Sequence, residues 1–560
     1  MTPDDDLGQA EDPGACQTTE TPSKSRSGKT ELLCLLSLIG AALIPNILWI
    51  IRDRTPWPWD QAWYGEVSVD LWFNLTRSMV DWGRTMLTGM NLKPPGIVWL
   101  GQLFVPLGAL GGSIESALLF SVLLTQAVTL YLIFQIGRTI APKSYAVPAL
   151  GVSIAAAAQS FVGLSHQFFV EPLQALAVAW TVLIMVRCSE WPAARIMLHL
   201  AGALLAGILA KATTPIYCLL PCLYIAFVLI RKPLLQGWRS ELYSRSGRVL
   251  VISIVMAAPL TAMWYAVNLK AVWRHVRDSS SGEIALEYGA RASVGTKLVV
   301  WLKLLEQSFL SPYVSWVVIL VVAAGLVVRF ASAGRRSLPS PVRATAVLSA
   351  LQCGLLLLVF SMNDAVDARY MYAMLVFLAV IVMSICAPVT SRAAFAAMFA
   401  LCALQFIAVH RVVLGGAGVL PDQFEWLTKP HVDQTRYREV EGIVAITSTV
   451  AGRYNIVGVE EPWLNANTVS FFAAKHRLET GVRGYFTSLG YAEKNVAAAR
   501  KRVEDLNLLY YITLDEPFQT TPPNFVNIVS LPMLKQIRID PHFDQVPFPT
   551  ANGVVIFRHN

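Results

Sequence analysis

The chain has 560 residues, of which 55% are hydrophobic and only 15% are charged, and its mean hydropathy is +0.51. A soluble domain carries nearer a quarter charged residues, so the composition excludes an ordinary soluble protein and indicates a membrane protein. The formal net charge is +8, and its placement matters more than its sum; we expect no nucleic-acid partner. The eight cysteines form no CxxC pair and no visible disulfide framework.

The N-terminal segment, 1–28, contains Asp4-Asp5-Asp6 and then a Ser/Thr/Pro/Lys-rich stretch with almost nothing to bury. This composition is typical of a disordered tail. The first apolar run, 31–51, follows Lys24, Arg26 and Lys29. Positive charges before the first helix predict that the tail is cytoplasmic.

Apolar runs of roughly spanning length recur along the chain and predict about eleven transmembrane helices within 29–411. They lie at 31–51, 116–136, 145–163, 169–187, 196–211, 213–230, 249–268, 312–329, 343–361, 370–388 and 393–411. The segment 94–110 is also apolar, but it begins with Pro94-Pro95 and contains Pro106, so we expect an interfacial or re-entrant helix. With that segment left out, the basic loops fall on the cytoplasmic side of a plasma (inner) membrane, as the positive-inside rule requires.

An odd number of spans places the C-terminus outside the cytoplasm, together with two long loops at 52–115 and 269–311. Composition changes after residue 411, where charged residues are spread throughout. Short β-rich runs occur at 455–459, 508–514, 525–531 and 553–558, and helical patterns at 435–449, 465–476 and 491–507. The stretch 412–560 is therefore predicted to be an extracytoplasmic α/β domain.

The first long outer loop begins with a crowd of tryptophans and charged residues, Trp57-Pro-Trp-Asp-Gln-Ala-Trp-Tyr-Gly-Glu66. An aromatic belt at the membrane surface would explain the tryptophans. Asp60 lies between Trp59 and Trp63, where loss of hydration can raise the pKa of a carboxyl toward the range of a general base. Capping of a helix that starts near residue 61 is the equally weighted alternative for Asp60.

Two further ionisable residues lie at the outer ends of apolar runs. Glu171-Pro172 stands near the outer mouth of the fourth run, and an ionisable group in such a place is a functional candidate. Lys211 closes the fifth run at the same level. A lysine there can bind substrate, or can simply extend its ammonium to the membrane surface.

Basic residues also gather where orientation does not require them. Arg369 and Tyr370 enter the tenth run from the outer side, and the loop 269–311 carries Arg274 and Arg277. An excess of cations suits a phosphate or an anionic headgroup, although a solvated loop of mixed charge is the alternative. These groups share the outer membrane plane, which suits a substrate with a long apolar tail and an anionic head.

Several short motifs follow one another in a familiar order over roughly residues 30 to 390. They are Asp60-Gln-Ala-Trp-Tyr-Gly-Glu66, Lys93-Pro94-Pro95, Glu171-Pro172, Ala210-Lys211-Ala212 and Arg369-Tyr370. This order resembles integral membrane glycosyltransferases of the GT-C class, particularly the family of protein O-mannosyltransferases and lipid A aminoarabinose transferases. Gln61 stands where that family has a second acid, Glu171 replaces its Asp, and the match around Lys211 is loose.

The resemblance implies a polytopic α-helical GT-C fold that transfers a sugar, with inversion, from a polyprenyl-phosphate carrier to a lipid, glycan or protein acceptor. It assigns catalysis to Asp60, the general base, and Glu171, and substrate binding to Tyr64, Glu66, Lys93, Lys211, Arg274, Arg277, Arg369 and Tyr370. In this assignment Lys93, Lys211 and Arg369 hold the departing lipid phosphate. The lipid-linked sugar is a substrate, and neither a metal ion nor another cofactor is expected.

Two other classes of function compete with the enzyme. A transporter or flippase of a lipid-linked sugar would line its path with the same charges, but no inverted repeat is visible in the sequence. A receptor or structural module built on the C-terminal domain would leave the crowded first loop unexplained.

Overall fold

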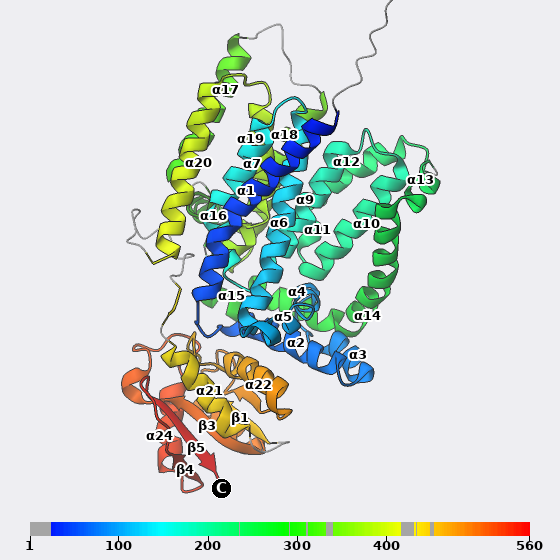
Figure 1. The fold of residues 1–560 in the computed structure, drawn as a ribbon. Helices are drawn as coiled ribbons and strands as arrows, with labels where there is room; N and C mark the ends of the chain where they lie inside the picture. Colours follow the sequence, from blue (N-terminus) through cyan, green and yellow to red (C-terminus); the bar gives the residue numbers. More distant parts are fainter. Residues whose placement is uncertain are drawn as a thin grey trace, which may run out of the picture.

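The computed structural model describes residues 24–234, 236–289, 292–309, 312–331, 340–415, 430–432, 434–448 and 453–560. A bundle of helices fills the upper part of Figure 1, and a small α/β domain lies below it. Most of the predicted disordered tail, 1–23, lies outside the described residues. Its last residues, 24–28, form the start of the first helix instead.

Six helices in the described part of the chain are long and apolar enough to cross a membrane. They are α1 (Lys24–Arg52), α6 (Ile114–Ile140), α10 (Ala193–Ala210), α14 (Arg245–Ser281), α18 (Ser340–Met362) and α20 (Arg392–Val413). Two bent pairs raise the number to eight: α7 (Ala146–Ala157) with α8 (Gln159–Ser165), bent by 62°, and α16 (Val294–Phe309) with α17 (Pro312–Ala331), bent by 103°. The chain is a multi-span membrane protein.

The other three predicted spans form helices shorter than a typical crossing, so six to eight candidate spans stand against the predicted eleven. They form α9 (Glu171–Arg187), α12 (Leu219–Ile230) and α19 (Met374–Cys386), of 17, 12 and 13 residues, against about 20 for a full crossing. A break at Cys218 separates α12 from the short helix α11 (Thr214–Tyr217). The 3₁₀ helix η1 (Ala368–Met371) similarly takes up the beginning of the last of these runs.

Four helices between α1 and α6 lie at the end of the bundle that faces the C-terminal domain (Figure 1). They are α2 (Trp59–Leu75), α3 (Met79–Thr88), α4 (Gly96–Gly101) and α5 (Val105–Gly111). The predicted interfacial segment 94–110 holds α4 and α5, of six and seven residues, which are too short to cross. The second predicted outer loop is mostly helical, because α14 continues to Ser281 and is followed by α15 (Glu283–Glu287) and α16.

The C-terminal domain is built on a five-stranded mixed sheet in the order β2-β1-β3-β5-β4. The strands are β1 (Tyr454–Val457), β2 (Tyr485–Ser488), β3 (Leu508–Leu514), β4 (Phe543–Val546) and β5 (Val554–His559). β1 is parallel to both β2 and β3, whereas β5 is antiparallel to β3 and β4. The helices are α21 (Thr435–Thr447), α22 (Ala466–Thr480), α23 (Val496–Asp505) and α24 (Ser530–Ile539).

Three of the four predicted strand runs in this domain are confirmed, and the run 525–531 is wrong. Asn527 turns the chain there: its backbone N–H donates to the carbonyl of Asn524 at 3.0 Å. Its side-chain oxygen accepts from the backbone N–H of Glu460 at 2.7 Å. These local bonds replace those of a strand.

The aromatic contact between α2 and α22 holds the two parts of the chain together. The Trp57 ring stacks on Phe168 of the bundle and on Phe471 of α22, with centroid distances of 5.7 and 5.1 Å. A Cβ atom on Gly65 would come within 2.8 Å of the Phe471 ring, so glycine permits this close packing. The Thr468 hydroxyl also donates to the carbonyl of Trp57 at 2.6 Å.

Buried charges reinforce the same interface. Arg483 donates to the carboxylates of both Glu66 and Asp70 on α2, and Arg477 lies 3.5 Å from Asp70. Burial and the neighbouring charge of Asp70 raise the pKa of Glu66 to about 7, against the opposing effect of Arg483. The guanidinium groups of Arg483 and Arg477 thus face two buried carboxyl groups of α2.

Replacing Arg483 tests this interface. Arg483→Met leaves two buried carboxylates poorly compensated, and we expect a loss of about 3–5 kcal/mol in the free energy of unfolding at pH 7. Without the guanidinium, burial raises the folded-state pKa of Glu66 still further above its unfolded value. The loss therefore shrinks as pH falls toward 5.

The measurement is the melting temperature of the full chain at both pH values. Lys501→Met is the matched control, because within the described residues Lys501 pairs only with Asp505, in an exposed i,i+4 contact. Equal losses in the two variants, or a loss that does not change with pH, would contradict the assignment.

Candidate active site

Asp60 is the second residue of α2, which begins after Pro58. Its negative charge lies in the first turn, where the helix dipole stabilises an anion. The carboxylate does not cap the helix; its Oδ2 atom lies 2.5 Å from Nζ of Lys93. The structure therefore does not support the capping alternative, and it adds an ion pair that neither alternative included.

The pKa of Asp60 is lowered, and the expectation that loss of hydration raises it is wrong. Burial does oppose ionisation, but the Lys93 ammonium outweighs it, and Arg369 and His275 add to the effect of Lys93. The carboxylate is thus ionised at neutral pH. Its side chain keeps 36% of its surface exposed, so it can still be reached by a ligand.

Lys93 lies near the end of α10 because the segment that follows Lys93 packs closely against that helix. A Cβ atom on Gly96 would lie 2.6 Å from the carbonyl oxygen of Leu209, so glycine lets α4 begin directly against α10. The Lys93 ammonium also lies 5.8 Å from the centre of the Tyr64 ring. This packing brings Lys93 to the level of Lys211.

Glu171 and Lys211 form a second, more deeply buried ion pair. Lys211 Nζ lies 2.8 Å from Glu171 Oε1, and the Glu171 side chain is only 4% exposed. Glu171 opens α9 and Lys211 follows the last residue of α10, so each charge suits the dipole of its own helix end. The other carboxylate oxygen of Glu171 is buried with no hydrogen-bond partner among the described residues.

A third pair joins the first two. Asp367 accepts from the backbone N–H of Arg369 at 2.9 Å and from its guanidinium at 2.5 and 2.8 Å. The charge of Arg369 also interacts with Glu171 and Asp60. The Lys211 ammonium lies 4.4 Å from the centre of the Tyr370 ring. We call Asp60, Lys93, Glu171, Lys211, Asp367 and Arg369 the charged cluster.

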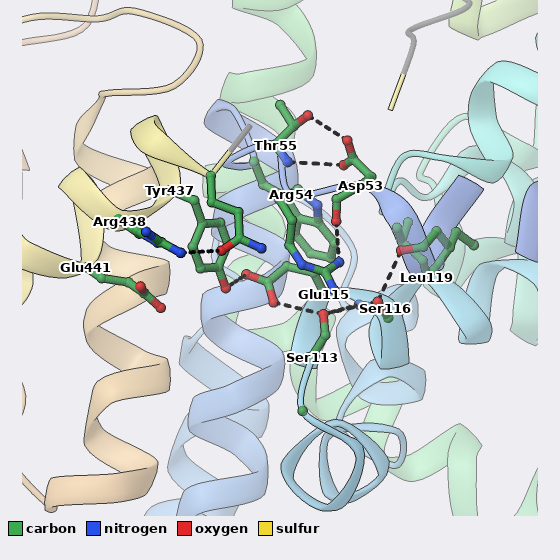
Figure 2. A pocket seen from close by; sticks show the side chains of 14 residues that line it. Asp53, Arg54, Thr55, Ser113, Glu115, Ser116, Leu119, Tyr437, Arg438 and Glu441 are labelled. Carbon is green, nitrogen blue, oxygen red and sulfur yellow. Dashed lines mark hydrogen bonds between the residues drawn. The ribbon is translucent and has the colours of Figure 1, made fainter. Parts of the chain in front are cut away.

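A polar cavity of about 200 Å³ lies between the end of α1, the start of α6 and α21. Figure 2 shows that its side chains bond mainly to one another. Tyr437 donates to Glu115 at 2.9 Å, and Arg54 donates to the carbonyls of Ile51 and Asp53 at 3.1 and 2.6 Å. No residue of the charged cluster lines this cavity. Because the polar side chains that line it are hydrogen-bonded within the protein, we interpret it as part of the interface between the bundle and the C-terminal domain.

No group of three or more His, Cys, Asp or Glu side chains in the described ranges is arranged to hold a metal ion. The acids of the charged cluster instead face lysine or arginine partners. The arrangement therefore favours binding of an anion that competes for these cations.

Neither a family model nor a curated protein matches the sequence. Solved structures do match. ArnT from Cupriavidus metallidurans bound to undecaprenyl phosphate aligns with a TM-score of 0.58 and 13% identity, over 93% of this chain and 97% of that chain. Its apo form gives a TM-score of 0.55 and 12% identity, over 95% and 98% of the two chains.

The archaeal oligosaccharyltransferase AglB from Archaeoglobus fulgidus, in complex with an inhibitory peptide and a dolichol-phosphate, also aligns. Its TM-score is 0.53 at 10% identity, and the match covers 95% of this chain and 74% of that chain. This chain has the GT-C fold. The predicted fold class is confirmed at that level.

Within this GT-C fold, most of the predicted site residues come together. Asp60, Tyr64, Lys93, Glu171, Lys211, Arg369 and Tyr370 all belong to the charged cluster or contact it. Glu66 instead bonds Arg483 at the interface with the C-terminal domain. Arg274 and Arg277 are exposed on α14, and in the described part of the chain neither forms an ion pair with the cluster.

The sequence analysis missed several residues of the site. Asp367 lies only two positions before Arg369, and an acid so close to a candidate arginine was an available signal. His275 interacts electrostatically with Asp60 and Lys93. The sequence did not single out His275 because residues 269–311 were predicted to be an outer loop, whereas α14 extends to Ser281 and includes this residue. No sequence signal pointed to Glu460, which accepts from Trp59 Nε1 at 3.1 Å.

Removing Lys93 tests the control of Asp60. Since the pKa of Asp60 is lowered in the folded state, the pair stabilises the fold above the unfolded pKa and loses effect only as pH falls through the folded value. In Lys93→Met, burial is opposed only by the smaller effects of Arg369 and His275, so that pKa rises. We expect a loss of about 1–2 kcal/mol at pH 7, since the pair is only half-buried.

The loss should shrink toward pH 5, and it should be reversed in the double variant Asp60→Asn/Lys93→Met. Melting temperatures of the full chain in lipid nanodiscs give both readouts. A destabilisation that is independent of pH and is not rescued by Asp60→Asn would show that Lys93 does not act through Asp60.

Proposed function

We propose that the chain is an inverting glycosyltransferase that moves a sugar from a polyprenyl-phosphate carrier to an acceptor outside the cytoplasm. The observation that carries this proposal is the meeting of Asp60, Lys93, Glu171, Lys211 and Arg369, from five separate segments, in one cluster. The fold supports it, since ArnT with undecaprenyl phosphate bound is built in the same way.

The basic loops at the far end of the bundle support the proposed orientation. α12 and α13 (Trp238–Tyr243) lie at the end opposite the C-terminal domain (Figure 1). Lys232 and Arg195 lie there too, and they bond locally to backbone carbonyls and to Glu241. The positive-inside rule makes that end cytoplasmic and puts the charged cluster outside, as expected for a plasma-membrane enzyme.

The lipid phosphate would be held by Lys93, Lys211 and Arg369. At rest each of these cations has a carboxylate partner, so the site is nearly neutral. As the bond between the sugar and the phosphate breaks, the phosphate gains negative charge. Charge-assisted hydrogen bonds to the three cations become stronger as this charge develops. They therefore stabilise the transition state more than the bound donor, and this lowers the activation free energy of transfer.

An apolar groove of about 900 Å³ between α10 and α14 is suited to the polyprenyl chain. Leu205, Leu209, Val249 and Ile254 line it, among others. Leu209 is only two residues before Lys211. A chain lying in this groove would therefore present its phosphate to the charged cluster.

Asp60 would act as the general base. Its carboxylate takes the proton from the acceptor hydroxyl, and the hydroxyl oxygen attacks the anomeric carbon on the side opposite the phosphate. The bond from that carbon to the phosphate oxygen breaks, the electron pair leaves with the phosphate, and the configuration inverts. The unpartnered oxygen of Glu171 is free to accept a hydrogen bond from a hydroxyl of the donor sugar.

A flippase is the alternative, and the position of the charges counts against it. The charged cluster is built at the first turn of α2, the start of α9 and the end of α10. Of these, α2 lies at the end of the bundle that faces the C-terminal domain (Figure 1). A translocation pathway is expected to carry polar groups near the middle of the membrane.

Asp60→Asn tests the proposed mechanism. Removing a general base typically lowers the rate by 10²–10⁴-fold, and we expect at least a hundredfold loss of kcat for transfer from labelled polyprenyl-phosphate sugars. Binding of polyprenyl phosphate should be retained or strengthened, because Lys93 loses its carboxylate partner. The readouts are single-turnover transfer and equilibrium binding.

Asp81→Asn is the matched control, since Asp81 is an exposed acid of the same region whose ion pair, in the part of the chain that the structure describes, is with Arg84. It should transfer at the wild-type rate. If Asp60→Asn also transfers at nearly that rate, Asp60 is not the base; if it still moves the donor lipid across the bilayer, the flippase is favoured.

A further inference from the structure

In the C-terminal domain, the carboxyl ends of the parallel strands lie on the side of the charged cluster. β1 is parallel to its neighbours β2 and β3. The chain leaves β1 toward β2 on one side and then crosses to β3 on the other. In open α/β sheets such a reversal leaves a crevice at the carboxyl ends of the strands, where ligands commonly bind.

The segment that follows β1 carries Glu460 to the start of α2. Glu460 Oε2 accepts from the indole N–H of Trp59 at 3.1 Å, and Trp59 directly precedes Asp60. The backbone on either side of Glu460 is fixed by Asn527, which bonds its N–H at 2.7 Å and its carbonyl at 3.3 Å. The carboxylate is therefore held in place beside the charged cluster.

Glu460 is a buried acid that the fold itself does not explain. The residue is only 8% exposed, and in the described ranges no cation lies within ion-pair distance of it. Burial raises its pKa to about 7, and only the Trp59 bond opposes this. An acid kept in such a place costs stability, which points to a ligand.

Aromatic residues of the helical bundle and of the C-terminal domain lie at the same site. The hydroxyls of Tyr288, after α15, and Tyr491, after β2, are hydrogen-bonded to each other. Tyr288 also meets Phe525 edge-to-face at 5.2 Å. Both tyrosine hydroxyls interact electrostatically with Asp60.

The chain is shaped to bring Tyr288 there. A Cβ atom on Gly289 would clash with the carbonyl oxygen of Asp364, so glycine allows the two segments to pair at Gly289 and Ala365. Lys494 forms an ion pair with Glu287 at 2.6 Å, which ties the same turn to the C-terminal domain.

We propose that Glu460, with the rings of Trp59, Tyr288 and Tyr491, binds the acceptor, and that the acceptor is a glycan whose sugar hydroxyl is the attacking group. A carboxylate accepts strong hydrogen bonds from hydroxyl groups. Aromatic rings offer flat apolar surfaces with polar tips, which match the face and the rim of a sugar ring. This inference rests on the proposed function, because it assigns the acceptor side of the same reaction.

Glu460→Gln is the test, in the full chain. The amide oxygen of Gln keeps the Trp59 bond, so folding should be unchanged, but the charge is lost. With labelled polyprenyl-phosphate sugars as donor and membranes of a strain lacking the chain as acceptor source, we expect the apparent KM for acceptor to rise about tenfold. The value of kcat and the Kd for polyprenyl phosphate should change by less than about twofold.

Glu461→Gln is the matched control, since that neighbour bonds Thr520 and Asn527 instead. Linkage analysis of the product should place the label on a sugar hydroxyl. An unchanged KM for acceptor in Glu460→Gln overturns this inference. So does label that is attached to serine or threonine of a protein, or directly to a lipid. In each of these cases the proposed transferase activity itself is not contradicted. No transfer by the wild-type chain from any polyprenyl-phosphate sugar overturns both.

Discussion

The ion pair between Asp60 and Lys93 is the contact on which the site depends. It joins the first turn of α2 to the segment that precedes α4, and it keeps the Asp60 carboxylate ionised although burial opposes this. Isolated charges in such surroundings are expensive, and each therefore needs a partner from elsewhere in the chain. Glu171 with Lys211 and Asp367 with Arg369 meet the same requirement, so the need for partners draws distant segments to one place.

Helix ends supply the other half of this arrangement. Asp60 and Glu171 lie in first turns, and Lys211 directly follows a last turn, so the helix dipoles favour the charges that the cluster holds. Pro58 precedes the first residue of α2, and Gly96 lets α4 begin directly against α10. A phosphate entering the site would find its cations already positioned, and its binding would cost little reorganisation.

The packing of α2 against α22 makes the C-terminal domain part of the same unit. Trp57 and Gly65 meet Phe471 closely, and Arg483 bonds two acids of α2. The helix that carries Asp60 is thus fixed on one side by the bundle and on the other by the C-terminal domain. This fixed position is what lets Glu460 of the C-terminal domain bond Trp59, the residue that precedes Asp60.

The sequence predicted those features that depend on local pattern. The apolar runs led to α1, α6, α10, α14, α18 and α20, and the short motifs led to most of the cluster. It failed where distant partners decide: the pKa of Asp60 depends on Lys93, 33 residues away. Glu66 matched a motif but bonds Arg483 at the domain interface.

The span count failed for a related reason, because composition does not reveal a break such as the one at Cys218 or the 3₁₀ turn before α19. Glu460 was out of reach altogether. Its place depends on how a separately folded sheet docks on α2, and a single sequence holds no pattern for that contact.

The central claim is that the three cations of the cluster hold a lipid phosphate beside Asp60. An experimental structure of the full chain with polyprenyl phosphate bound tests it most directly. We expect phosphate oxygens within about 3 Å of nitrogen atoms of Lys93, Lys211 and Arg369, with the lipid chain leaving toward the groove between α10 and α14. A phosphate bound elsewhere, for example at the exposed Arg274 and Arg277, would contradict it.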